Sequence, residues 1–245
     1  MRRVMRSSGD LIADRRYRYG LALAEDGDFN AAADLFEQAL ERAPAWADAW
    51  FALGRARREA HDPAGAATAF REALRCDPAD ILGASLELSR LDASVEIDAA
   101  PLAHVKGLFN SYAEDFDKAL VERLAYATPQ KLSAMVADMG GVTPRHFRRV
   151  LDLGCGTGLS GEAFVASAGW LEGVDLADAM VAEARNKGVY DALACSDIMS
   201  FLGETEHTYD LIVAADVFIY FGDLKHLFAA ASAKLAPGAL FAFSV

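Results

Sequence analysis

The stretch Val150-Leu151-Asp152-Leu153-Gly154-Cys155-Gly156-Thr157-Gly158 determines how the second half of the 245-residue chain folds. An apolar run of strand length carries one acid and then breaks into glycines at alternate positions, and we expect a helix from about Leu159. Glycine lets the backbone turn sharply and approach a ligand that a Cβ would hold away. The stretch therefore predicts a buried strand, a loop across which a small molecule lies, and a helix.

Apolar runs of strand length alternate with helical stretches from residue 148 to residue 245. Such alternation predicts βαβ units, which means a doubly wound α/β sheet of Rossmann-like type with helices on both faces. Ligands on such sheets bind beyond the carboxyl ends of the strands. The predicted strands are residues 150–153, 171–175, 192–195, 211–215 and 239–245, and the predicted helices are residues 159–168, 177–186 and 223–235.

A carboxylate closes each of the first four predicted strands: Asp152, Asp175, Asp197 and Asp216. Taken singly, each acid is typical of a helix N-cap or a turn. Because the carboxyl ends of parallel strands meet at one edge of a sheet, we expect all four to face one crevice. The crevice should therefore carry negative potential.

The sign of that potential separates two classes of ligand. Residues Gly156 to Gly161 satisfy GxGxxG, with Asp175 at about the expected distance, so a dinucleotide and an NAD(P)-dependent oxidoreductase are a rival interpretation. A pyrophosphate needs a helix N-terminus free of negative charge, however. A cofactor with positive charge beside a ribose and a base fits better, and S-adenosylmethionine carries an ammonium and a sulfonium.

Residues Leu151 to Gly158 resemble the glycine motif of Rossmann-like, S-adenosylmethionine-dependent methyltransferases. The resemblance implies that Asp152 and the loop hold the methionine end of the cofactor, and that Asp175 accepts the ribose hydroxyls. It also implies that Met180 lies against the adenine, with Asp197 and Ile198 at the adenine edge. The residues expected to bind the cofactor are Tyr112, Phe116, Asp152, Gly154, Cys155, Gly156, Gly158, Asp175, Leu176, Met180, Asp197, Ile198 and Asp216.

Methyl transfer is an in-line displacement at carbon, so the protein chiefly positions the acceptor and covers the site. The candidate catalytic residues are Asp216, which the resemblance places near the transferable methyl, and Tyr220, a candidate base for the acceptor. A pocket wall or core position is the other interpretation of Tyr220. His226 is a further candidate base, or else an exposed helix residue. No cluster has metal-ligand spacing, so we expect no metal.

The first part of the chain repeats itself at a spacing of 34 residues. The repeat predicts helical hairpins in which a small residue lies at the helix crossing, an aromatic fills the space beside it and proline ends the second helix. The second copy resembles a tetratricopeptide repeat, because Trp50, Leu53, Gly54, Ala66, Phe70, Ala73 and Pro78 match its pattern. The first copy departs from the pattern at Arg16 and could be frayed there or capped by another element. The matched positions are Gly20 and Gly54, Ala32 and Ala66, Phe36 and Phe70, and Pro44 and Pro78.

The resemblance to tetratricopeptide repeats implies a partner peptide in a concave groove. The competing interpretation is that so short an array only packs on its neighbour or pairs with a second copy as a homodimer. A peptide-binding repeat protein with a non-catalytic cofactor domain is accordingly the alternative function. The methyl acceptor, whether a small molecule or a protein, is not identified by the sequence.

We predict three parts: an all-α repeat domain at residues 1–92, a helical linker or lid at 93–147, and the Rossmann-like domain at 148–245. Tyr112 and Phe116 recur at helical spacing in the middle part, where they are either core residues or a cover over the cofactor, because an aromatic face attracts a cation. The chain resembles methyltransferases with N-terminal repeats, in which the stretch Tyr112 to Asp117 precedes the catalytic domain, and this favours the cover.

Composition indicates which binding partners and which cellular location to expect. A formal charge of −12 argues against binding to nucleic acid, which needs clustered Lys and Arg. The scattered cysteines form no CxxC pair, and no apolar run approaches the length of a membrane span, so we expect a cytoplasmic protein without a membrane segment. The methyltransferases it resembles have seven strands, whereas the fifth ends this chain; we expect about two more strands and a helix in the natural protein, or association through that edge.

Overall fold

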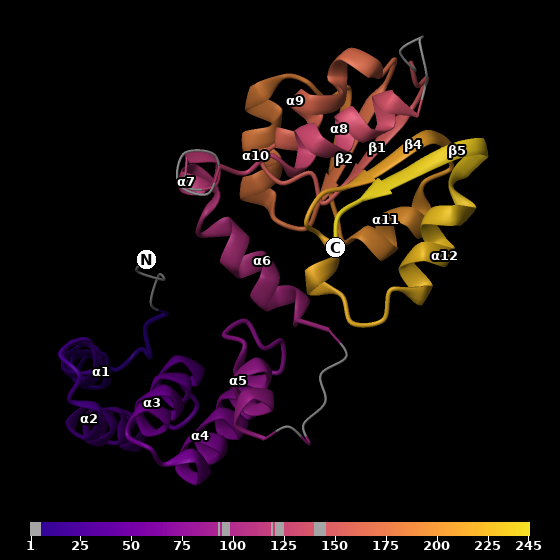
Figure 1. The fold of residues 1–245 in the computed structure, drawn as a ribbon. Helices are drawn as coiled ribbons and strands as arrows, with labels where there is room; N and C mark the ends of the chain where they lie inside the picture. The colour runs from indigo at the N-terminus through magenta and orange to yellow at the C-terminus, as the bar shows by residue number, and fades with distance from the viewer. Residues whose placement is uncertain (1–5, 93, 95–98, 119, 121–124, 140–145) are drawn as a thin grey trace. The chain divides into compact units, whose positions relative to one another are not determined.

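The computed structural model describes residues 6–92, 94, 99–118, 120, 125–139 and 146–245. The chain divides into two compact units, Met1–His104 and Val105–Val245 (Figure 1). Each unit is described separately below. Parts of the predicted linker or lid lie outside the described residues, namely residues 93, 95–98, 119, 121–124 and 140–145. Within those residues, no helix is long and apolar enough to cross a membrane.

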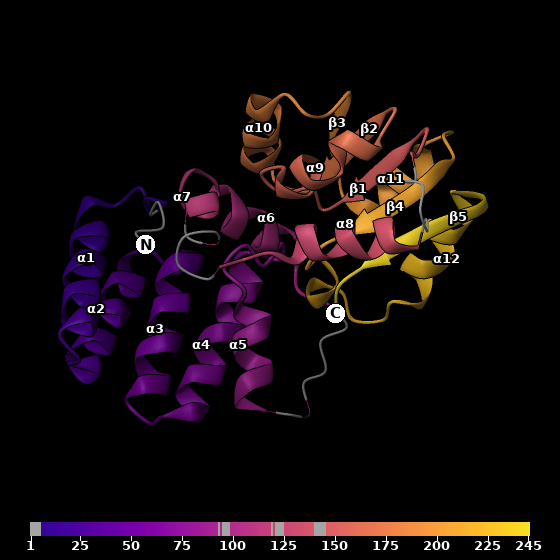
Figure 2. The same cartoon turned by 45° about the horizontal axis from the view of Figure 1, so that its top comes forward.

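The first unit is a row of antiparallel helices, which lie side by side in Figure 2. Aspartates begin three of them: the carboxylates of Asp10, Asp28 and Asp62 accept hydrogen bonds from backbone N–H groups of the first turn. Such capping satisfies donors that have no partner inside the helix. The helices are α1 (Leu11–Glu25), α2 (Phe29–Arg42), α3 (Ala47–Glu59), α4 (Pro63–Cys76) and α5 (Ala84–Leu91).

The predicted helix crossing occurs in both repeats. A Cβ built on Gly20 would lie 2.7 Å from the ring of Phe36, and one built on Gly54 would lie 2.6 Å from the ring of Phe70. Both rings are fully buried. The 34-residue repeat therefore reflects a repeated contact, in which a glycine on one helix makes room for an aromatic ring on the next.

The first repeat forms a complete hairpin in spite of its departure at Arg16. Helix α1 is continuous, and Arg16 Nη1 donates to the carbonyl of Gln38 on α2 at 2.7 Å. The last helix of the unit, α5, begins at Ala84. Asp80 lies in the preceding turn, and its carboxylate accepts from the N–H of Ala84, where α5 begins, at 2.6 Å.

The second unit contains one sheet whose strand pairs are all parallel, in the order β3-β2-β1-β4-β5. The predicted doubly wound α/β sheet is thus confirmed. The chain turns from β1 to β2 on one side, whereas β4 lies on the other, so the crevice for a ligand is expected beyond the carboxyl ends of β1 and β4. The strands are β1 (Val150–Leu153), β2 (Leu171–Asp175), β3 (Ala192–Cys195), β4 (Tyr209–Ala214) and β5 (Leu235–Phe243).

Helices cover both faces of the sheet (Figure 1), and alternate residues of β1 are buried in opposite layers. Val150 packs with Val136 of α8 and Phe164 of α9, whereas Leu151 is buried with residues of α11 and α12. Helix α8 is therefore part of a layer that covers the sheet. The helices of the unit are α6 (Leu102–Asn110, which begins in the first unit), α7 (Ala113–Asp117), α8 (Thr128–Asp138), α9 (Leu159–Phe164), α10 (Asp178–Lys187), α11 (Ile198–Glu204) and α12 (Lys225–Ala233).

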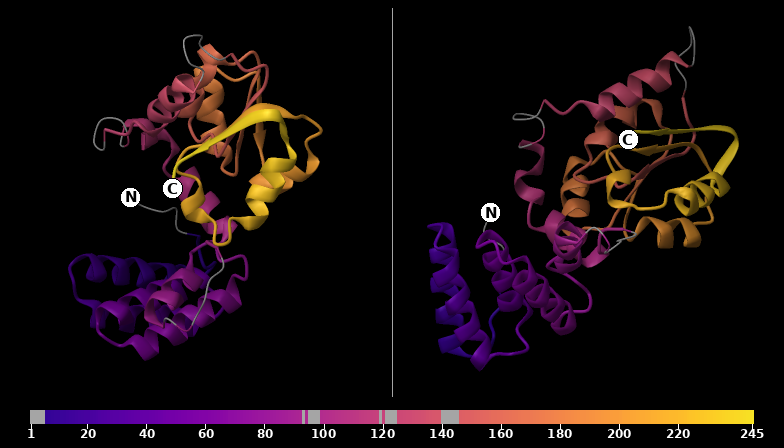
Figure 3. Two further views of the ribbon diagram at one scale, coloured as in Figure 1. Left: turned by 45° about the vertical axis from the view of Figure 1, so that its right-hand side comes forward. Right: turned by 60° about the horizontal axis from the view of Figure 1, so that its bottom comes forward.

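Two details differ from the sequence prediction. Helix α11 was not predicted, because a helix of seven residues gives little periodicity. Strand β5 begins at Leu235, within the stretch predicted as helix, and includes Pro237. Pro237 lies where the register of β5 is irregular, between the pairs Tyr209–Leu235 and Leu211–Leu240, at one side of the described sheet (Figure 3). Proline is tolerated at such irregularities because its missing N–H interrupts no regular ladder.

Candidate functional site

The glycine loop after β1 forms the floor of the crevice. Gly154, Gly156 and Gly158 have φ angles of 68°, 52° and 96°, in the left-handed region that glycine adopts without strain. A Cβ on Gly154 would lie 2.5 Å from Val217, which follows β4, so the loop closely approaches the neighbouring strand end. A Cβ on Gly156 would meet nothing within 4 Å, so the backbone there is open to a ligand.

Asp152 lies beneath this loop and is only 1% exposed. Its Oδ2 accepts a hydrogen bond from Tyr190 Oη at 2.6 Å, while its Oδ1 has no hydrogen-bond partner among the described residues. Burial raises the pKa of this carboxyl group to about 7; the hydrogen bond from Tyr190 opposes that shift, and the charge of Asp175 adds to it. The site therefore contains a buried acceptor whose charge changes near neutral pH.

Asp175 at the end of β2 ties the loop to the next strand. Its Oδ2 accepts from the N–H of Gly156 at 2.9 Å, and its Oδ1 accepts from the N–H of Ala177 at 2.8 Å. Burial raises the pKa of Asp175 as well. Each carboxylate oxygen can accept a second hydrogen bond, so Asp175 retains capacity for a ligand hydroxyl.

Asp216 occupies the other side of the crevice, just after β4. Its φ is 56°, an uncommon conformation for a residue with a side chain, and such strain often occurs at functional sites. Ser244 holds it on both sides: the N–H of Asp216 donates to Ser244 Oγ, which donates in turn to Asp216 Oδ1, each at 2.7 Å. The Asp216 side chain remains exposed.

Tyr126 belongs to this site, and the sequence prediction missed it. The residue precedes α8 and follows Ala125, another residue with positive φ. Burial raises the pKa of the Tyr126 hydroxyl, and a hydrogen bond to Asp216 raises it further, with a smaller contribution from the charge of Asp152. Tyr126 therefore lies near both acids. The sequence predicts only a helical linker or lid over this stretch.

Helix α6 is attached to the first turn of α10 by a side-chain clamp. Asn110 Nδ2 donates to Asp178 Oδ1 at 2.9 Å, and Asn110 Oδ1 accepts from the N–H of Ala179 at 3.0 Å. Lys106 forms an ion pair with the same Asp178 at 3.2 Å. The segment Val105–Asp117, called the cover below, is therefore held beside the residues that follow β2.

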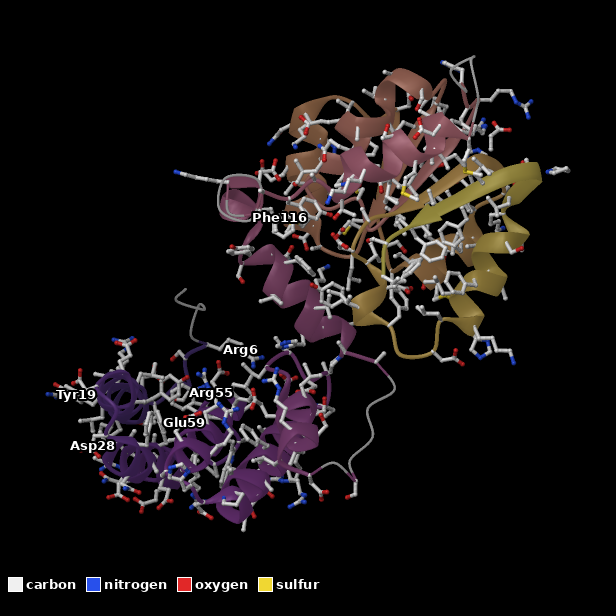
Figure 4. All side chains as sticks on the ribbon, viewed as in Figure 1. Arg6, Tyr19, Asp28, Arg55, Glu59 and Phe116 are labelled. Carbon is white, nitrogen blue, oxygen red and sulfur yellow. The ribbon has the colours of Figure 1, made fainter. Side chains whose placement is uncertain are left out.

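Aromatic side chains of the cover extend across to Tyr220. The ring centroids are 5.8 Å apart for Tyr112 and Phe116, 5.9 Å for Phe116 and Phe109, and 5.4 Å for Phe109 and Tyr220. Phe116, marked on α7 in Figure 4, packs with Phe109 against Met180, which is 1% exposed. The pKa of Tyr220 is raised by its burial and by the charge of Asp216. The expected cover and the candidate base thus belong to one aromatic chain.

Other residues from the sequence prediction have structural partners. Asp197 is the N-cap of α11 and accepts from the N–H groups of Met199 and Ser200, and these bonds hold its pKa below its usual range against the effect of burial. Ile198 lies in the core at 7% exposure. Cys155 is buried, whereas the Leu176 carbonyl accepts from Cys195 Sγ at 3.7 Å. His226 is an exposed residue of α12.

Three of the four strand-end acids are coupled at the crevice. Asp152 interacts with Asp175, and Tyr126 interacts with both Asp216 and Asp152. Asp197 follows β3, which lies two strands away from β1. Within the described residues, no group of His, Cys, Asp and Glu is arranged to hold a metal ion.

A cavity of about 480 Å³ lies at the amino-terminal ends of the strands, where β1 and β4 begin. It is lined by residues that include Arg148, Arg149, Trp170 and His207. Ligands of doubly wound sheets bind beyond the carboxyl ends of the strands, so this cavity does not mark the ligand site.

The parallel sheet, the glycine loop and the acids define a Rossmann-like domain for a small-molecule cofactor. Residues 150–238 match the family model of a methyltransferase domain, and residues 17–81 match that of a tetratricopeptide repeat. The second unit is thus similar to a methyltransferase domain, and the first unit is similar to tetratricopeptide repeats. A search of curated proteins finds no match.

Solved structures that resemble the chain include several methyltransferases. A complex of DhpI with SAH is 20% identical and has a TM-score of 0.48, covering 58% of this chain and 67% of DhpI. An S-adenosylmethionine-dependent methyltransferase from Clostridium acetobutylicum ATCC 824 is 30% identical with a TM-score of 0.45, covering 56% of each chain. The N-methyltransferase NodS from Bradyrhizobium japonicum WM9 is 25% identical with a TM-score of 0.39, covering 46% of this chain and 58% of NodS. This chain thus spans less than two thirds of the latter two.

Proposed function

We propose that the second unit binds S-adenosylmethionine and transfers its methyl group to an acceptor, leaving S-adenosylhomocysteine. The match of residues 150–238 to a methyltransferase domain supports this. The observation that carries the proposal is the buried Asp152 carboxylate, whose Oδ1 has no partner in the described structure, beneath a glycine loop that is open at Gly156. A buried acceptor without a partner needs an explanation, and a cationic ligand supplies one.

The residues present fit this cofactor. Gly156 leaves space that a Cβ would fill, and Asp175 retains acceptor capacity for ribose hydroxyls. We assign the methionine end to Asp152 and the loop from Gly154 to Gly158, including Cys155. The ribose is assigned to Asp175, and the adenine to Leu176, Met180, Asp197 and Ile198. Tyr112 and Phe116 of the cover would shield the bound molecule from water.

When bound, the cofactor supplies a methyl group on a sulfonium, a good leaving group. The side chains then need only to orient the acceptor, exclude water and remove a proton where the acceptor carries one. Asp216 and Tyr220 are the candidate catalytic residues, with Tyr126 as a further candidate because it interacts with Asp216. An acceptor N–H or O–H placed between these groups would donate its proton to the Asp216 carboxylate.

Isothermal titration calorimetry with S-adenosylhomocysteine tests the cofactor assignment. We expect binding by the wild-type chain and a loss of at least about tenfold for Asp152→Asn, the size of a hydrogen bond to a charged group. Glu204→Gln, on the exposed end of α11, is the control and should bind like the wild type. Failure of the wild type to bind would overturn the proposal. Binding of NADH that improves in Asp152→Asn would favour the rival dinucleotide interpretation.

We also propose that the repeats bind a protein partner, which the match of residues 17–81 to a tetratricopeptide repeat supports. Tyr19 on α1 is 55% exposed, and Arg55 on α3 is exposed too, so both are available for contact (Figure 4). Light scattering during size-exclusion chromatography distinguishes a homodimer from a monomer that binds another partner.

We propose a cytoplasmic location, which the three free cysteines support.

A further inference from the structure

Tyr190 lies between α10 and β3, and its hydroxyl joins two parts of the site. It donates to Asp152 Oδ2 at 2.6 Å and accepts from the N–H of Gly161 at 3.0 Å. Gly161 belongs to the first turn of α9, where backbone N–H groups have no partner inside the helix. One hydroxyl therefore accepts a hydrogen bond from a backbone N–H at the start of α9 and also fixes one oxygen of the buried acid under the glycine loop.

The ring of Tyr190 occupies space that three glycines provide. A Cβ would lie 3.2 Å from the Tyr190 side chain if built on Gly158, 2.4 Å if built on Gly161 and 2.9 Å if built on Gly173. These glycines come from the loop, from α9 and from β2. Any larger residue at the last two positions would force the ring away, so the surrounding backbone determines where the Tyr190 hydroxyl lies.

The two oxygens of Asp152 consequently differ in their hydrogen bonding. Tyr190 occupies Oδ2, and Oδ1 is the oxygen left without a partner in the described structure. A carboxylate free to rotate would present either oxygen to a ligand, at a cost in conformational freedom on binding. The Tyr190 hydrogen bond removes that freedom in advance.

We propose that Tyr190 is a positioning residue of the cofactor site, which orients the Asp152 carboxylate toward the ammonium group of S-adenosylmethionine without touching the cofactor itself. The inference rests on the proposed function. It adds a residue that lies 38 positions along the chain from Asp152 and outside the glycine motif.

Tyr190 also influences the charge of Asp152. The Tyr190 hydroxyl and Asp175 from β2 act on this carboxyl, and its charge in turn raises the pKa of Cys155 in the loop and of Tyr126 ahead of α8. Of these, the hydrogen bond from Tyr190 is the one that lowers the pKa of Asp152. Without the hydroxyl, the pKa of Asp152 should rise further, and the acid should stay neutral to a higher pH. An ammonium ligand needs the ionised form. As the pH is lowered, the affinity of the variant for this ligand should therefore begin to fall at a higher pH than that of the wild type.

The experiment measures the affinity for S-adenosylhomocysteine by calorimetry between pH 6 and pH 8.5. Tyr190→Phe keeps the ring, so it should fold, but it should bind roughly tenfold more weakly at pH 7, and the midpoint of its pH dependence should move upward. Tyr209→Phe is the matched control, because Tyr209 Oη donates to the buried Glu172 at 2.8 Å in the core of the same sheet. It should change the melting temperature and leave the pH midpoint in place.

A double variant distinguishes an effect through Asp152 from a nonspecific loss of stability. If Tyr190 acts through Asp152, adding Tyr190→Phe to Asp152→Asn should not weaken binding further. An equal loss in both backgrounds, or a wild-type affinity and midpoint for Tyr190→Phe, would overturn the inference while leaving the proposed function intact. A wild-type chain that binds at no pH would instead overturn the proposed function, and this inference with it.

Discussion

Asp117, the last residue of α7, accepts a hydrogen bond at Oδ1 from Thr157 Oγ1 in the glycine loop. The same carboxylate pairs through Oδ2 with Lys187 Nζ of α10 at 2.8 Å, and Lys187 also pairs with Glu162 of α9 at 2.8 Å. Thr157 is buried, at 2% exposure. The cover is thereby connected to the loop itself, and a closed cover and an ordered loop stabilise each other.

Removing this connection should accelerate release of the cofactor product. For Asp117→Ala we expect S-adenosylhomocysteine to dissociate roughly three- to tenfold faster, because one hydrogen bond and one partly exposed ion pair are lost. Surface plasmon resonance with immobilised protein measures that rate. Glu162→Ala is the control: it removes the other partner of Lys187 but leaves Thr157 and Asp117 joined. Equal rates for the two variants would show that the Thr157 contact does not hold the cover.

The helix crossing in the second repeat predicts that one added methyl group at Gly54 strongly destabilises the fold. Gly54→Ala should lower the free energy of unfolding by about 1–3 kcal/mol, as is usual for overpacking, because its Cβ would lie 2.6 Å from the fully buried Phe70. Thermal and urea denaturation of the full chain measure the loss. Adding Phe70→Leu should recover part of it. Gly203→Ala, whose Cβ would meet nothing within 4 Å, should be neutral or stabilising; a loss as large as that of Gly54→Ala would contradict this account.

The fold was predictable because its signals are local. The 34-residue spacing reflects one contact made twice, Gly20 with Phe36 and Gly54 with Phe70. The alternation of apolar runs and the glycine stretch identified four of the five strands to within two residues. Helix α11 was missed, since the acid that begins it, Asp197, had been interpreted only as a ligand acid or an unspecified cap or turn residue.

The candidate site was predictable only in part, because its contacts join residues distant in sequence. The acids at strand ends follow from the topology of a parallel sheet. By contrast, Tyr190 meets Asp152 across 38 positions and Thr157 meets Asp117 across 40, and neither spacing leaves a periodic signal. Tyr126 was missed for the same reason. Such pairs depend on which helices pack together, and that follows from tertiary structure.

The left-handed backbone at Asp216 predicts an order of stabilities among its variants. Glycine has no steric penalty at a φ of 56°, whereas alanine does, so Asp216→Gly should be more stable than Asp216→Ala by about 1 kcal/mol. Both changes remove the side-chain acceptor of Ser244, so the comparison isolates the backbone. Differential scanning fluorimetry without ligand measures the difference. Equal melting temperatures would mean that Asp216 is not held in this conformation.

The buried acid Asp152 predicts how stability changes with pH. Its pKa is about 7 in the folded chain and near 3.8 when exposed, so the folded state binds the extra proton between those values. Stability contributed by this group is therefore fully present below about pH 4 and is lost as the pH rises through 7, by a few kcal/mol at most, since each pKa unit corresponds to about 1.4 kcal/mol. Asparagine cannot ionise and escapes this loss. The advantage of Asp152→Asn over the wild type, measured by urea denaturation without ligand, should consequently be larger at pH 8 than at pH 5. A difference between the two proteins that stays constant over this range would contradict the raised pKa. Saturating S-adenosylhomocysteine should reduce the advantage of Asp152→Asn at pH 8, because the ligand binds the ionised acid more tightly than it binds asparagine.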